Sequence, residues 1–339
     1  MKPLKGKVAV VAGATRGAGR GIACMLGEAG ATVYCSGRST RAHPAATGIY
    51  AGRPETIDET SEMVTTYGGV GIAVRTDHLE EKQVESLFKR VRRGHGRLDI
   101  LVNDISEGEI YDWQPFWKLP LKKGLRALRN GIHSHIITNR YAAPLMVEKG
   151  RGIIVEIGDG DTLAYRGHLF YDLVKVTINR LALAMAEELH PHGVAAVAMS
   201  PGYMRTEYAL DHFGVTEANW RDGAKKDPDF LASETPCYVG RAIAALAADP
   251  HVLEKSGGVY SSWGLAREYG FTDIDGSQPD LEKHFGAKFG ESPFGPPRTR
   301  FRWSMSRTPE PRRPKARRGN MSKRPKQKDK TPARQRPIR

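Results

Sequence analysis

Tyr171 and Lys175 are the residues of this sequence whose types and spacing best suit acid/base chemistry. Residues four apart on a helix project from the same face, one turn from each other. A free phenol titrates near pKa ~10, so proton transfer near neutral pH requires a shift of about three units, or about 4 kcal/mol. A cation ~4 Å away supplies about that much where the effective dielectric constant is about 20. The pair therefore predicts a phenol acid/base tuned by a neighbouring ammonium.

A glycine-rich loop near the start of the chain predicts a phosphate site. It follows the apolar run 8–11, which is typical of a buried parallel strand, and precedes apolar residues with helical spacing. Such a turn lets the backbone approach a pyrophosphate, while the helix N-terminus offers free N–H groups. The alternative is an ordinary tight turn. The loop residues that we expect at a cofactor are Gly13, Thr15, Arg16, Gly17, Ala18 and Gly19.

Further motifs follow this loop in order along the chain. They are Asp77, Asn103 after the apolar run 98–102, Asn130, the Tyr171/Lys175 pair, and Pro201-Gly202 with Thr206. Together with the glycine loop, the set resembles the short-chain dehydrogenase/reductase family over roughly residues 4–265. Within the family, the chain is more similar to bacterial members and the dehydrogenase/reductase member 1 type than to steroid dehydrogenases. The resemblance implies hydride transfer at a nicotinamide cofactor.

The same resemblance implies a role for each matching residue. Tyr171 would pass a proton to or from the substrate oxygen, Lys175 would lower the pKa of the phenol and hold the nicotinamide ribose, and Asn130 would steady a water chain. Asp77 would bind the adenine amino group and Asn103 would line the adenosine pocket. The remaining residues that we expect at the cofactor are His78, Pro201, Gly202 and Thr206.

The end of the second strand-like run, 32–35, indicates the choice of cofactor. A carboxylate at this place would bind the ribose 2′-OH and repel a 2′-phosphate. Here Arg38 and Ser39 follow the run with no acid nearby in sequence, and Arg16 is expected close to them. Guanidiniums suit a phosphate through forked hydrogen bonds, so we predict NADP(H). The alternative is that both arginines are solvated loop charges.

One element of the family pattern is missing. The family places a serine about thirteen residues before the tyrosine, where this chain has Gly158 followed by Asp159. Losing one donor to a developing oxyanion costs on the order of 10²–10³ in rate. Asp159 or Asp161, if protonated, could donate a hydrogen bond in place of the serine, and if ionised the two acids could bind a cationic substrate or a divalent ion. Alternatively, the chain could have lost most of its catalytic activity. The segment could also be a plain turn, since Gly and Asp fit turns for backbone reasons. The other hydroxyls considered as replacements are Thr162, Tyr165 and Tyr203.

The order of elements predicts an α/β fold with a doubly wound parallel (Rossmann-type) sheet in a single domain. The strand-like runs are 8–11, 32–35, 70–74, 98–102, 153–157, 194–199 and 258–261. We expect this domain over 1–270, a C-terminal extension over 271–295, and a disordered, basic, proline-rich tail over 296–339. The segment 203–236 has no clean period and corresponds to the family's substrate loop.

The net charge of +14 is concentrated in the tail. Residues 296–339 carry seventeen Lys or Arg and two acids, which leaves the rest of the chain at a net −1. Such an arm binds polyanions weakly and without specificity, or is a solvated appendage with no partner. Three cysteines without metal-ligand spacing favour a reducing cytoplasm, and we expect no signal peptide and no membrane span. His133 and His135 are too poorly spaced for a shared metal site.

These observations lead to one main hypothesis and one from another class. The first is an NADP(H)-dependent reductase or dehydrogenase acting on a small carbonyl or alcohol, with Tyr171, Lys175, Asn130 and an atypical Asp159 at the catalytic centre. Family resemblance implies a homodimer or homotetramer. The second is a catalytically weak, cofactor-binding regulatory or scaffold protein with a polyanion-binding tail.

Overall fold

The structure is a computed structural model, and it describes residues 2–45, 48–106, 108, 114–160 and 165–289. The chain divides into two units, 1–299 and 300–339, and all of the described residues belong to the first. The predicted tail, 296–339, lies outside the described residues, as do Asp161 and Thr162.

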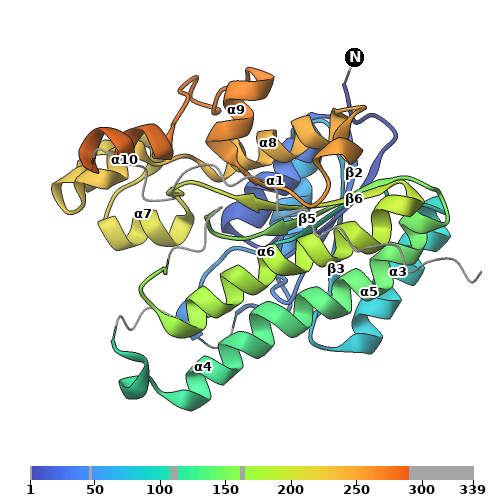
Figure 1. Ribbon diagram of the computed structural model, residues 1–339, viewed down its shortest axis with the longest axis horizontal. Helices are drawn as coiled ribbons and strands as arrows, with labels where there is room; N and C mark the ends of the chain where they lie inside the picture. Colours follow the sequence, from blue (N-terminus) through green and yellow to red (C-terminus); the bar gives the residue numbers. More distant parts are fainter. Residues whose placement is uncertain (1, 46–47, 107, 109–113, 161–164, 290–339) are drawn as a thin grey trace, which may run out of the picture. The chain divides into compact units, whose positions relative to one another are not determined.

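Seven parallel strands form one sheet in the order β3-β2-β1-β4-β5-β6-β7 (Figure 1). The predicted doubly wound parallel sheet is confirmed, because every predicted strand is present within one or two residues. Each strand is rich in apolar, often β-branched residues, as buried parallel strands are. The bounds are β1 Val8–Ala12, β2 Thr32–Gly37, β3 Val70–Arg75, β4 Ile100–Asn103, β5 Gly152–Ile157, β6 Val194–Ser200 and β7 Val259–Ser261.

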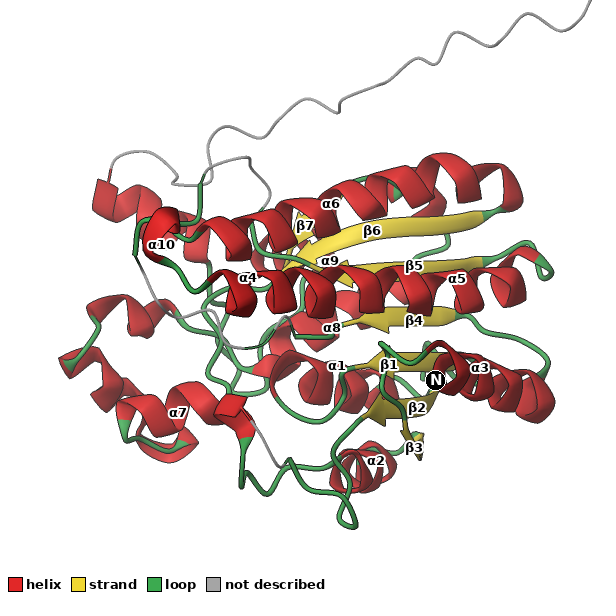
Figure 2. Ribbon diagram, turned by 90° about the horizontal axis from the view of Figure 1, so that it is seen from below, coloured by secondary structure: helices red, strands yellow, loops and turns green. Residues whose placement is uncertain are grey.

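Helices cover both faces of the sheet (Figure 2). One face packs against residues of α1 (Gly17–Glu28), α2 (Ile57–Thr66), α8 (Pro236–Ala248) and α9 (Ser262–Tyr269). The other packs against α3 (Glu81–His95), α5 (Ser134–Val147) and α6 (Leu169–Leu189). The apolar face predicted for α3, at Val84, Leu87, Phe88 and Val91, is buried.

Two further groups of helices lie beyond these layers. The helix α4 (Leu121–Leu128) continues through a π-helical turn, Arg129–His133, into α5. The segment without a clean period contains α7 (Glu207–Phe213) and 3₁₀ turns at Glu217–Lys225 and Pro228–Ala232, and α10 (Leu281–Phe289) follows later. The strands β2 and β3 are added on one side of β1, and β4 and the later strands on its other side. Because the order of addition reverses there, the carboxyl ends of β1 and β4 open a crevice between them.

Candidate active site

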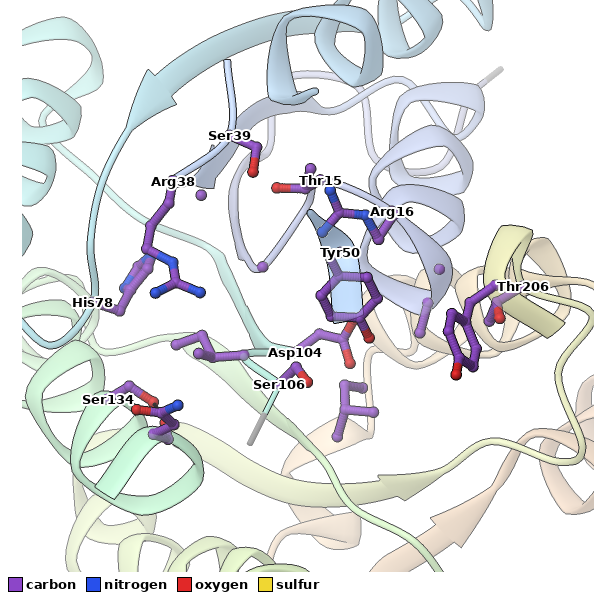
Figure 3. A pocket seen from close by; sticks show the side chains of 18 of the residues that line it. Thr15, Arg16, Arg38, Ser39, Tyr50, His78, Asp104, Ser106, Ser134 and Thr206 are labelled. Atoms are coloured by element: carbon purple, nitrogen blue, oxygen red, sulfur yellow. Dashed lines mark hydrogen bonds between the residues drawn. The ribbon is translucent and has the colours of Figure 1, made fainter. Parts of the chain in front are cut away.

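A pocket of about 310 Å³ lies at the carboxyl ends of the strands, at the switch point between β1 and β4 (Figure 3). Most of the residues expected at the cofactor line it, whereas Gly19, Asn103, Pro201, Gly202 and Tyr171 are not among its lining residues. The predicted residues that do line it are Gly13, Thr15, Arg16, Gly17, Ala18, Arg38, Ser39, Asp77, His78, Asn130, Lys175 and Thr206.

The glycine loop fits closely against the end of β4. Gly13 has φ +92°, and a Cβ there would lie 2.1 Å from the carbonyl oxygen of Asp104. A Cβ on Gly19 would lie 2.4 Å from the carbonyl oxygen of Gly13. Gly19 is therefore needed for packing beneath the loop, while Gly13 and Gly17 border the pocket. This cradle, which side chains would fill, fits a dinucleotide pyrophosphate.

Arg38 and Arg16 stand differently in the pocket. The Arg38 side chain is exposed and points into the pocket beside His78 (Figure 3), and within the described part of the chain its guanidinium makes no hydrogen bond or ion pair. Arg16 Nε instead lies 3.3 Å from Glu55 Oε2, and its guanidinium stacks 4.5 Å from the centre of the Tyr50 ring. Of the two predicted arginines, Arg38 is thus the one whose charge lacks a carboxylate partner among the described residues.

Glu55 is an acid that the sequence analysis missed. Its carboxylate is buried and also accepts hydrogen bonds from Arg53, the shortest at 2.7 Å. Burial disfavours the charged form, but the bonds from Arg53 and Arg16 outweigh it and lower the pKa of Glu55. It lies in the long loop after β2, seventeen positions beyond Arg38, in a segment with no periodicity. Its place two residues before α2 is therefore the sequence signal that could have drawn attention to it.

Behind the pocket, Asn103 joins a buried polar network instead of the pocket wall. Its side-chain amide donates to Asn139 Oδ1 at 2.9 Å and to Glu156 Oε1 at 2.8 Å. Glu156 Oε2 lies 2.5 Å from His135 Nδ1. Burial opposes the charged imidazole, but Glu156 outweighs it, so the pKa of His135 is raised. The network fixes the end of β4 below the pocket.

His78 and Asp77 hold the loop after β3. The ring of His78 is buried, with Nε2 2.9 Å from Ser36 Oγ and Nδ1 2.8 Å from Thr138 Oγ1. Burial, with a smaller effect of His135, lowers the pKa of His78 to about 3, so the ring is neutral near pH 7. Asp77 Oδ1 accepts a bond from the N–H of Leu79 at 3.0 Å. Both residues line the pocket and turn the loop around it.

The helix α6 carries the predicted pair, Tyr171 and Lys175, at the pocket. Lys175 lines the pocket, and its Nζ lies 5.3 Å from the centre of the Tyr171 ring. The Tyr171 hydroxyl donates to Asp159 Oδ2 at 2.6 Å. Asn130 lies in the π-helical turn, where its carbonyl oxygen accepts a bond from the Ser134 hydroxyl. The structure thus brings Tyr171, Lys175 and Asp159 together.

The space that a serine side chain would take at position 158 is filled by Asn179. A Cβ on Gly158 would lie 2.6 Å from Asn179 Oδ1, and the Asn179 amide donates to the Gly160 carbonyl at 3.0 Å. The Tyr203 hydroxyl donates to Asp227 Oδ2 at 3.0 Å, and Tyr165 is exposed to solvent. Of the replacements considered for the serine, Asp159 is therefore the described residue that contacts Tyr171.

Pro201 and Gly202 lead from β6 toward α7 and contact the protein interior. A Cβ on Gly202 would lie 2.5 Å from Glu234 Oε2. Glu234 is buried, and burial raises its pKa to about 8. Thr206 begins α7 by accepting a bond from the N–H of Ala209 at 3.2 Å, and the next residue, Glu207, also lines the pocket. An acid directly after a capping threonine is the sequence signal that could have drawn attention to Glu207.

Two further absences hold within the described part of the chain. No helix there is long and apolar enough to cross a membrane. No group of three or more His, Cys, Asp or Glu side chains there could hold a metal ion.

A parallel sheet with a glycine cradle at its switch point, and with Lys175 in the same pocket and Tyr171 beside it on α6, is the arrangement expected of a dinucleotide-dependent oxidoreductase of the short-chain type. The model of the family described as short chain dehydrogenase matches residues 7–213. The chain therefore belongs to the short-chain dehydrogenase/reductase family, as its motifs indicate.

Particular relatives extend this assignment over most of the chain. Dehydrogenase/reductase SDR family member 1 of Mus musculus is 38% identical, over 81% of this chain and 85% of the relative. Its Homo sapiens counterpart is 36% identical over the same shares. Among solved structures, a short chain dehydrogenase from Mycobacterium thermoresistibile superposes with a TM-score of 0.68 at 22% identity, covering 87% of this chain and 98% of that one. The predicted resemblance to the member 1 type is confirmed.

Proposed function

We propose that this chain is an NADP(H)-dependent oxidoreductase that moves hydride between the nicotinamide and a small carbonyl or alcohol substrate. The observation that carries the proposal is that Lys175 lines the same pocket as the glycine loop, with Tyr171 one turn away on α6. When bound, the nicotinamide supplies or accepts the hydride. Tyr171 holds and moves the proton at its phenol oxygen, Lys175 provides the neighbouring positive charge, and Asn130, which lines the pocket, steadies a water chain that returns the proton to solvent.

The choice of NADP(H) over NAD(H) rests on Arg38. Its guanidinium is exposed at the end of β2, where the ribose 2′ position is expected, and Ser39 lies next to it. A phosphate offers oxygens to a planar guanidinium in forked, charge-assisted hydrogen bonds. In this proposal Arg16 contributes less, because Glu55 already pairs with it.

The test is oxidation of NADPH, followed by its absorbance, with a panel of aldehydes, ketones and quinones, and with NADH in parallel. We expect turnover by the wild type and its loss in Tyr171→Phe, which keeps the ring and removes the hydroxyl. NADPH binding without any turnover would favour the alternative function, a catalytically weak cofactor-binding regulatory or scaffold protein. The contact between the phenol and Asp159 favours that alternative, since it engages the proton that carbonyl reduction uses.

We also propose a homodimer or homotetramer in a reducing, cytoplasmic environment. Exposed apolar side chains line α4 and the outer sides of α5 and α6, at Leu121, Leu125, Ile136 and Leu173, and a second copy would bury them. The three cysteines are free. Light scattering of the full chain tests the oligomer.

Deleting 296–339 should remove nearly all affinity for polyanions if the basic tail binds them.

A further inference from the structure

We propose that Asp159 selects substrates whose reacting carbon is bonded to nitrogen, so that the site interconverts amines and iminium ions in preference to alcohols and ketones. The inference rests on the hydride transfer proposed above and refines its substrate class. Its basis is the carboxylate that lies against the Tyr171 hydroxyl, directly after Gly158, at whose position the family pattern has a neutral hydrogen-bond donor.

The Asp159 carboxylate is both held in place and reachable. Its Oδ2 accepts the Tyr171 hydroxyl at 2.6 Å, while its side chain remains 37% exposed. Arg166 Nε lies 3.9 Å from the same oxygen. However, Arg166 also lies 3.6 Å from Asp172 Oδ1, so among the described residues its guanidinium is shared between at least two carboxylates. The negative charge of Asp159 is therefore only partly compensated and can act on a bound substrate.

Reduction of a ketone is poorly served by this arrangement. Hydride addition to a carbonyl places negative charge on oxygen, which neighbouring donors must stabilise, and loss of one donor costs on the order of 10²–10³ in rate. Gly158 supplies no hydroxyl, and Asn179 Oδ1 occupies the space of its Cβ. The Ser200 hydroxyl is engaged too, since it accepts the N–H of Gly160 at 2.7 Å. An oxyanion near Tyr171 would instead face a carboxylate.

The amine–iminium couple has the opposite charge requirement. As the α-carbon of a neutral amine gives its hydride to oxidised nicotinamide, the nitrogen lone pair forms the C=N bond and the nitrogen gains one positive charge. No proton moves in that step. In the reverse direction, the iminium carbon accepts a hydride and the C=N electrons return to nitrogen. A carboxylate stabilises the cation that develops during oxidation, and it keeps an N–H imine protonated for reduction. Tyr171 orients that carboxylate.

The experiment compares two rings of the same size, cyclopentanone and the N-methylpyrrolinium ion, as substrates for NADPH oxidation by the full chain. In the wild type we expect kcat/KM for the cation to exceed that for the ketone by at least about tenfold. Asp159→Asn keeps the shape and the acceptor for Tyr171 but removes the charge, and it should lower kcat/KM for the cation by roughly 10²-fold. Asp159→Ser should raise kcat/KM for the ketone. Glu187→Gln, at an exposed carboxylate on α6, the helix that carries Tyr171, should change neither.

A binding measurement gives a readout that is independent of turnover. The dimethylpyrrolidinium ion has a permanent charge and cannot react, and calorimetry in the presence of NADP⁺ measures its affinity. We expect Asp159→Asn to weaken it about tenfold and to reduce its dependence on salt. Thermal unfolding checks that the variant is folded.

The outcomes separate this inference from the proposed function. Ketone turnover that equals or exceeds turnover of the cation, with a ratio unchanged in Asp159→Asn, overturns the inference and leaves the proposed function intact. No turnover of either ring or of the carbonyl panel overturns the proposed function. In that case the affinity for the unreactive cation decides the charge selection: a loss in Asp159→Asn supports it, and an unchanged value overturns it.

Discussion

The N–H of Gly17 donates a hydrogen bond to Glu207 Oε2 at 2.8 Å, so a side-chain carboxylate lies at the N-terminus of α1. Arg20 Nε lies 3.7 Å from the other oxygen of the same group. The first N–H groups of a helix attract anions, and in a dinucleotide fold they face the pyrophosphate. Glu207 therefore occupies a position that a phosphate oxygen would also favour.

We predict that Glu207→Gln binds NADPH more tightly than the wild type. The substitution keeps the side-chain length but removes a charge that competes with phosphate at Gly17 and repels it. Charges near a helix N-terminus contribute about 1–2 kcal/mol in favourable geometry, so the dissociation constant should fall roughly tenfold. Fluorescence titration of NADPH measures this. Glu254→Gln, at an exposed carboxylate far along the chain, should leave the affinity unchanged, and weaker binding by Glu207→Gln would contradict the prediction.

We predict that Arg38→Ala weakens binding of NADPH much more than binding of NADH. Removing a forked, charge-assisted contact to a phosphate should raise the dissociation constant for NADPH by roughly 10–100-fold, since such bonds contribute about 1.5–3 kcal/mol. NADH lacks the 2′-phosphate, so its affinity should change little. Arg41→Ala is the matched control, because Arg41 pairs with Glu62 and does not line the pocket. Equal losses for both cofactors would show that Arg38 does not read the 2′-phosphate.

Much of the fold could be predicted because it depends on local pattern. Runs such as Val8–Ala12 are apolar along their whole length, which is the pattern of strands covered on both faces. The carboxyl ends of those strands carry Gly13 and Arg38, so the pocket followed from the order of the strands. Tyr171 and Lys175 could be paired because a helix relates them by simple geometry.

The parts that could not be predicted are contacts between loops distant in sequence. Glu55 reaches Arg16 across thirty-nine positions, and Glu207 reaches Gly17 across one hundred and ninety. No periodicity links such residues. The family pattern also suggested cofactor contacts for Asn103 and Gly202. In the structure, the Asn103 side chain donates to Glu156, and a Cβ on Gly202 would point at Glu234, both inside the protein. The sequence did not indicate that these two carboxylates are buried, because no local pattern distinguishes a buried acid from an exposed one.

The space beside Gly158 provides a prediction about stability. A Cβ there would lie 2.6 Å from Asn179 Oδ1, so Gly158→Ser forces the Asn179 side chain away from its bond to Gly160. We expect the free energy of unfolding to fall by about 1–3 kcal/mol, as overpacking usually costs. In Gly158→Ser combined with Asn179→Ala, the serine has room, so the loss should be smaller than the sum of the two single losses. Chemical denaturation of the four proteins measures this cycle, and strict additivity would refute the steric explanation.

The last prediction concerns Glu234, whose carboxyl lies under the segment that leads to α7. Burial raises its pKa from 4.5 to about 8, although Ser262 donates to it at 2.6 Å. Among the described atoms, its Oε1 is buried without a hydrogen-bond partner. The folded chain thus keeps the proton on Glu234 at pH values where the unfolded chain has released it.

From this difference we expect Glu234 to make the fold less stable as the pH rises from about 4.5 to about 8. Between those two pH values the folded state holds a proton that the unfolded state has released. The contribution of Glu234 to the free energy of unfolding is therefore fully present at low pH and is lost as the pH rises, by up to about 1.4 kcal/mol per pH unit. Glu234→Gln stays neutral and retains an acceptor for Ser262. Its free energy of unfolding, measured by urea denaturation at several pH values, should exceed that of the wild type by an amount that grows with pH over this window. A constant difference between the two proteins would mean that Glu234 is ionised in the fold.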